Sequence, residues 1–88
     1  MSVSMSELVR AREVVEGLLE ELHISAYRFE VEPRGETWEI LIECTVSGGW
    51  MRRELKAGRE ELMRGADDAA VRQRLLDEWT AALSACQR

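Results

Sequence analysis

Few residues in this sequence could act as nucleophiles, bases or metal ligands. The chain has one histidine, His23, and two cysteines, Cys44 and Cys86. A cysteine nucleophile needs a base beside it, and a metal site needs several ligands in a recognisable spacing. A buried thiol and a helix-end histidine are the simpler interpretation. We therefore expect no catalytic residue, no cofactor and no metal, and keep an enzyme that uses Cys44 with His23 as a third hypothesis.

The two cysteines are too few and too far apart for a disulfide framework, and no C-x-x-C pair is present. Reduced thiols are the expectation. The N-terminal residues lack the basic and apolar regions of a secretory signal. The longest run without a charge, Cys44 to Met51, is eight residues, whereas a bilayer crossing needs about 20. We therefore expect a cytoplasmic protein with no membrane contact.

A basic segment interrupts an otherwise acidic chain of net charge −5. An aromatic ring is interleaved with cations at Trp50, Arg52, Arg53 and Lys56, a composition that can bind an acidic partner, a phosphate or a stacked base. The same cations can instead neutralise carboxylates on neighbouring strands. The acidic balance of the chain makes nucleic acid an unfavoured partner. These four residues are the candidate binding site.

A first amphipathic helix is predicted near the N-terminus. The spacing of Ser4 and Glu7 is typical of a capping box, so the helix begins near Ser4 or Ser6 and ends near His23. Residues 1–5 are predicted to be a loose tail of a single domain that spans residues 1–88. The apolar stripe comprises Leu8, Ala11, Val15, Leu18, Leu19 and Leu22.

A second helix is predicted near the C-terminus, with Asp67 or Asp68 as its cap. Residues 57–66 would connect it to the preceding element, with room for one helical turn around Glu60 to Arg64. The apolar stripe comprises Val71, Leu75, Leu76, Trp79, Ala82, Leu83 and Cys86.

A hairpin is predicted between the helices, because apolar and polar residues alternate from Tyr27 to Glu32 and from Thr37 to Val46. Pro33-Arg34-Gly35-Glu36 between them contains turn formers. Pairing Val31 with Trp38 aligns the two apolar faces and leaves a four-residue loop.

The same register sets Glu30 opposite Glu39, a like-charge pair that needs a cation nearby. Arg28, or an arginine from a third strand, could supply it.

The segment after the Ser47-Gly48-Gly49 turn admits two interpretations. Trp50 to Lys56 fits a short edge strand, although Arg53 then points inward. A helix is the alternative, with an apolar spacing formed by Met51, Leu55, Gly58 and Leu62. We favour the strand, because a Ser-Gly-Gly turn readily returns the chain antiparallel to the preceding strand.

The predicted fold is α+β: helix, three-stranded antiparallel sheet, helix, with both helices on one face of the sheet. This order is similar in topology to that of double-stranded RNA-binding domains. Those domains dock RNA with a basic run at the start of the second helix. Here the corresponding stretch is Asp67-Asp68-Ala69-Ala70, which would repel phosphate. RNA binding is therefore not expected.

These observations favour a small non-enzymatic module that acts through protein contacts, either with a second copy or with a partner protein. The second sheet face, with Thr37, Leu41 and Thr45 among charges, offers surface for association. The alternative is a binder of nucleic acid or a phosphorylated ligand through Trp50, Arg52 and Arg53.

Overall fold

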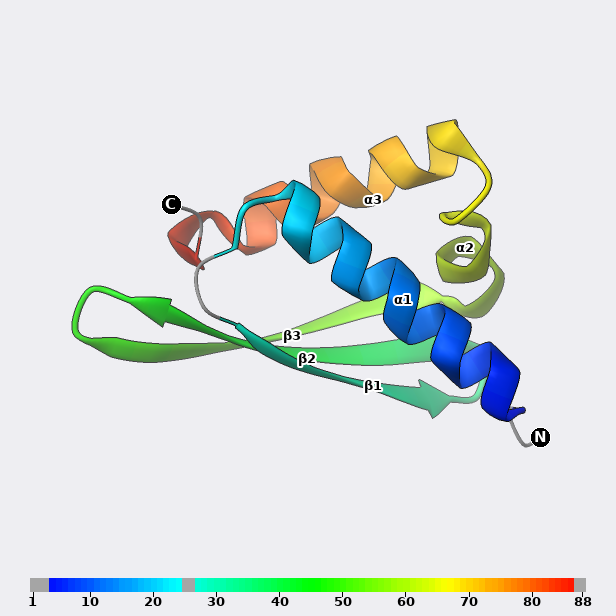
Figure 1. Cartoon of the computed structure of the whole chain (residues 1–88), viewed down its shortest axis with the longest axis horizontal. Coiled ribbons are helices and arrows are strands. Elements are labelled where there is room, and N and C mark those ends of the chain that lie inside the picture. Colours follow the sequence, from blue (N-terminus) through cyan, green and yellow to red (C-terminus); the bar gives the residue numbers. More distant parts are fainter. Residues whose placement is uncertain (1–3, 25–26, 87–88) are drawn as a thin grey trace.

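The computed structural model describes residues 4–24 and 27–86 of the chain. Its elements follow one another in the order α1 (Met5–Glu21), β1 (Arg28–Arg34), β2 (Thr37–Val46), β3 (Gly49–Gly58), α2 (Arg59–Arg64), α3 (Ala69–Ala82) and the 3-10 turn η1 (Ser84–Cys86). The strands form one antiparallel sheet in the order β1-β2-β3. Helices α1 and α3 lie over the same face of this sheet (Figure 1). The predicted α+β fold is confirmed.

Helix α1 starts at a side-chain cap. The hydroxyl oxygen of Ser4 accepts a hydrogen bond from the Glu7 N–H at 3.2 Å, which satisfies one of the free donors of the first turn. His23, with φ at 57°, turns the chain out of the helix. Ser4 and Met5 were predicted to belong to a loose tail, but they are the cap and the first residue of α1. Residues 1–3 lie outside the described residues.

The hairpin of β1 and β2 forms in a register two residues away from the predicted one. Val31 pairs with Ile40 rather than with Trp38, and the loop shortens to Gly35 and Glu36. Gly35 has φ at 61°, as a two-residue hairpin turn requires. Because the shift is an even number of residues, every side chain stays on its predicted face.

Pro33 therefore lies in β1 rather than in the turn, which an edge strand tolerates because only one of its sides must donate hydrogen bonds to the sheet. Glu32, not Glu30, lies opposite Glu39. Arg34 supplies the cation for this like-charge pair, with contacts of 3.1 Å to Glu32 and 3.2 Å to Glu39. Arg28, the cation suggested by the sequence, instead contacts Glu43 at 3.4 Å.

The third element is a strand, so the helical alternative for it is wrong. β3 pairs with β2 along its whole length, from Gly49 opposite Val46 to Gly58 opposite Thr37. Gly48 and Gly49 both have positive φ, at 97° and 146°, which glycine adopts without strain. The predicted single turn of helix appears as α2, which follows β3 directly.

The core lies between the sheet and the helices. Trp38 from β2 and Trp79 from α3 are 0% and 2% exposed, and they are the two largest side chains in it. The carboxylate of Asp68 accepts hydrogen bonds from the N–H groups of Ala70 and Val71, so the predicted cap of the second helix is confirmed. Val14 joins the α1 stripe as a buried residue that the predicted stripe left out.

Cys44 and Cys86 form a disulfide, so the expectation of two reduced thiols is wrong for this structure. Cys44 projects from the helix-covered face of β2, and η1 brings Cys86 to a Cα–Cα distance of 5.7 Å, within the usual disulfide range. The sequence separation of 42 gave no indication of this proximity. Because disulfides persist mainly in oxidising compartments, the bond weighs against the cytoplasmic location, which stays a prediction.

Removing the disulfide is expected to lower the free energy of unfolding, because the bond restricts the unfolded chain. The chain-entropy relation gives a loss of about 4 kcal/mol for a loop of this length. Urea unfolding with and without a reductant measures it. The Cys44→Ala/Cys86→Ala variant is the control and should be insensitive to reductant. A wild-type midpoint that does not move on reduction would contradict the bond.

Candidate functional site

One face of the sheet carries no helix. The side chains that point away from α1 and α3 form what we call the open face: Arg28, Glu30, Glu32, Arg34, Thr37, Glu39, Leu41, Glu43, Thr45, Trp50, Arg52, Glu54 and Lys56. The strand registers place them in rows that cross all three strands. Four of these residues are cations and five are carboxylates, so the open face has mixed charge rather than an excess of positive charge.

The rows of the open face differ in charge. Glu43 on the central strand lies between Arg28 and Arg52, and Glu39 lies between Glu32 and Lys56. The middle row has Leu41, half-buried, between two glutamates, Glu30 and Glu54. A shallow hollow of about 240 Å³ lies over this row. The hollow is thus lined by four carboxylates and two guanidinium groups around the half-buried Leu41.

The four predicted site residues do not lie together. Trp50, Arg52 and Lys56 share the open face, whereas Arg53 lies on the other face of the sheet, opposite Ile42. Arg53 is nonetheless exposed, because β3 is the outer strand and the helices leave this part of it uncovered. Arg53 therefore points toward the helix-covered side of the sheet, as predicted, but it is not buried there.

Trp50 is the most exposed of the three tryptophans, at 59%, and lies near the β2–β3 turn, which extends beyond the helices (Figure 1). The Arg28 guanidinium lies 5.8 Å from the centre of its ring, within the range of a cation–π contact. Arg52 and Lys56 face Glu43 and Glu39 on β2. Arg52 and Lys56 of the predicted site thus have carboxylates as cross-strand neighbours, whereas Arg53 lies opposite Ile42.

The outer edge of β3 is a second uncovered surface. β3 is ten residues long and is the last strand of the sheet. Within the described part of the chain, its backbone pairs with β2, and the N–H of its last residue, Gly58, donates to the Glu61 carboxylate of α2 at 3.4 Å. Alternate residues of an edge strand direct their N–H and C=O groups away from the sheet. The predicted edge strand is thus present, but the predicted binding site comprised the aromatic ring and cations of β3 and not its edge, with Met51, Leu55 and Glu54.

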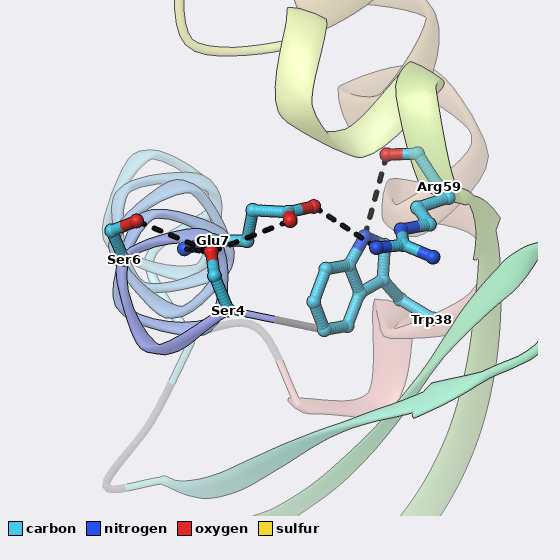
Figure 2. A network of polar contacts seen from close by, with 5 residues as sticks. All are labelled: Ser4, Ser6, Glu7, Trp38 and Arg59. Carbon is cyan, nitrogen blue, oxygen red and sulfur yellow. Dashed lines mark hydrogen bonds and ion pairs between the residues drawn. The ribbon is translucent and has the colours of Figure 1, made fainter. Parts of the chain in front are cut away.

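A cleft of about 840 Å³ opens where α1, the β1–β2 turn and α2 meet. Figure 2 shows the polar network beside it. Arg59 forms an ion pair with Glu7 at 3.2 Å, and its backbone carbonyl accepts a hydrogen bond from the Trp38 indole N–H at 3.3 Å. The Arg59 N–H in turn donates to the Glu36 carbonyl at 2.9 Å. These contacts join α2 to α1 and the sheet, so we interpret the network as structural.

The residues of the third hypothesis offer no nucleophile. The sulfur of Cys44 is bonded to Cys86 and the residue is fully buried. His23 is exposed at the end of α1. Elsewhere, burial together with the nearby carboxylates of Glu20 and Glu16 raises the pKa of the Tyr27 phenol above its ordinary value, which makes the phenol a weaker source of phenolate.

Replacing Glu7 by glutamine is expected to destabilise the fold at neutral pH and not in acid. The hydrogen bond from Arg59 holds the pKa of Glu7 below its ordinary value of 4.5. The folded state therefore binds fewer protons than the unfolded one, and the stabilisation is present above pH 4.5 and disappears as the pH falls through the lowered pKa. Urea midpoints of wild type and Glu7→Gln at pH 7 and pH 3 test this. The Glu13→Gln variant, on an exposed part of α1, is the control, and an equal loss at both pH values would contradict the ion-pair explanation.

Among the residues that the structure describes, no helix is long and apolar enough to cross a membrane, and no cluster of side chains has the composition of a metal site. We find no match to this chain among known protein families, curated proteins or solved structures.

Proposed function

We propose that this chain is a small protein-interaction module that acts through the uncovered surfaces of its sheet, by contact with a second copy or with another protein. The observation that supports it most is the one-sided packing of the sheet. All helices lie on one face, while in the described part of the chain no helix covers the open face and no further strand pairs with the outer edge of β3. Exposed strand edges are used by other proteins as surfaces for β-strand addition.

The composition of the open face supports the same proposal. A protein interface combines a small apolar or aromatic centre with a polar rim. Here Leu41 and the largely exposed Trp50 supply apolar area, and opposite charges surround them in rows. Such rows give an interface its orientation, because a misaligned partner brings like charges together.

The alternative function, binding of nucleic acid or a phosphorylated ligand, has weaker support. Its three residues are divided between two faces, since Arg53 points away from Trp50 and Arg52. The open face also holds five carboxylates against four cations, whereas phosphate binders rely on an excess of positive charge.

Site-specific photo-crosslinking tests the proposed function. A photoreactive amino acid placed at Leu41 or at Arg52 is expected to form adducts with a polypeptide in the cells that express the protein. The same amino acid at Glu78, on the solvent side of α3, is the matched control. The mass of each adduct tells a second copy from a different protein. Absence of adducts at both sheet positions, or equal yield at Glu78, would contradict the proposal.

Single-stranded oligonucleotides are expected not to bind at low salt. Trp38 and Trp79 are buried, so a change in tryptophan emission during a titration reports mainly on Trp50. We expect no quenching at low ionic strength, where phosphate contacts are strongest. Quenching that salt reverses, and that the Arg52→Ala/Lys56→Ala variant loses, would instead favour the alternative function.

A further inference from the structure

We propose that β3 pairs with β3 of a second copy, antiparallel and with Arg53 on the twofold axis, so that two three-stranded sheets join into one of six strands. This inference rests on the proposed interaction function and specifies its partner. It follows from the exposed edge of β3, from the alternation of its side chains and from the order of its charges.

Of the two sheet edges, β3 is the better suited to pairing. β3 has ten residues and no proline, whereas β1 has seven and contains Pro33. Proline cannot donate a backbone hydrogen bond and is a common device for blocking a strand edge. Most of β3 is also solvent-exposed, with Ala57 near its end as its one buried residue among those described.

Geometry restricts the possible registers. In an antiparallel pair, residues opposite each other point to the same face of the sheet. Each face of β3 holds residues of one parity, since Met51, Leu55 and Ala57 face the helix side and Trp50 and Lys56 face the open side. Opposite residues must therefore have position numbers that are both odd or both even. Only registers centred on a single residue of β3 satisfy this condition.

With Arg53 on the axis, β3 is complementary to itself. On the open face, Arg52 lies opposite Glu54 of the second copy, and twofold symmetry repeats this pair. On the helix face, Met51 lies opposite Leu55 of the second copy, also twice. Trp50 lies opposite Lys56 of the second copy, an arrangement compatible with a cation–π contact. Residues 49–57 of the two strands are aligned, which includes nearly all of β3.

The neighbouring registers are disfavoured by charge. A centre at Glu54 sets that carboxylate opposite its own copy and Arg52 opposite Lys56. A centre at Arg52 sets two guanidinium groups together and Trp50 opposite Glu54. Like charges directly opposite each other destabilise a strand pair. The register centred on Arg53 has one like-charge pair, Arg53 with its own copy, and this pair is exposed where water screens it.

A centre at Leu55 is the one other register with complementary charges, since it sets Glu54 opposite Lys56. It aligns only residues 52–58, however, and leaves Trp50 and Met51 without a partner. The register centred on Arg53 uses more of the strand and more of its apolar area. The two registers predict different outcomes for a charge reversal, so an experiment can separate them.

Light scattering and sedimentation over a wide concentration range, with the full chain, test the proposal. The wild type is expected to form a dimer, and Trp50 emission should shift to shorter wavelength as the concentration rises. Arg52→Glu and Glu54→Arg each turn two attractive pairs into repulsive ones, so each should raise the dimer dissociation constant about tenfold or more. The double variant R52E/E54R restores both pairs and should restore the dimer. In the Leu55-centred register the double variant would stay weakened, because it sets an arginine opposite Lys56.

The Arg53→Cys variant tests the axis directly. Opposite Cα atoms in an antiparallel pair lie roughly 4.5–5.5 Å apart, a separation that a disulfide can bridge. The thiols introduced at position 53 are expected to link two chains under mild oxidation, whereas Leu55→Cys should not. Circular dichroism of each variant verifies that the fold is intact.

Three results would overturn the proposed pairing: a monomer at every concentration, a dimer unaffected by all the charge reversals, or linkage through Leu55→Cys but not through Arg53→Cys. The proposed interaction function has a separate outcome. If the chain is monomeric while crosslinks at Leu41 or Arg52 capture a different protein, the pairing is wrong and the interaction function stands.

Discussion

The structure depends on the burial of one face of β2. This strand lies in the middle of the sheet, and its side chains Trp38, Ile40, Ile42 and Cys44 are all 0–1% exposed. Each of them contributes apolar area that must be removed from water, and together they form a strip that both α1 and α3 can cover. The indole N–H of Trp38 has a partner in the Arg59 carbonyl, so the largest side chain of this strip is buried without an unpaired donor.

The alternation along β2 explains how much of the fold can be inferred from the sequence. A period of two decides which face each residue occupies, and a helical stripe decides which side of a helix is buried, so the layers and the element order follow from local pattern. The hairpin register does not follow from it, because registers that differ by two residues bury the same faces. The sequence permits both a two-residue and a four-residue loop. The structure has the two-residue loop, with Gly35 at positive φ.

Contacts between distant parts of the chain are harder to infer. Cys44 and Cys86 each lie on an apolar stripe, which predicts burial but not contact, since their proximity depends on how α3 and η1 cross the sheet. The candidate site was partly predictable, because the period of a strand decides which of its residues share a face. Trp50, Arg52 and Lys56 share a face because their spacing is even, whereas Arg53 is separated from them by the same rule. Composition alone had grouped all four, and only the strand assignment divides them.

The disulfide also changes how a mechanical load would travel through the molecule. It ties the end of the chain at Cys86 to the middle of the central strand, and it encloses β3, α2 and α3 in one covalent loop. Tension applied at the two ends would therefore pass from η1 directly into β2 and would not reach the segment between them. β3, α2 and α3 would carry no tension along their own chain, whereas α1, β1 and β2 as far as Cys44 would carry it.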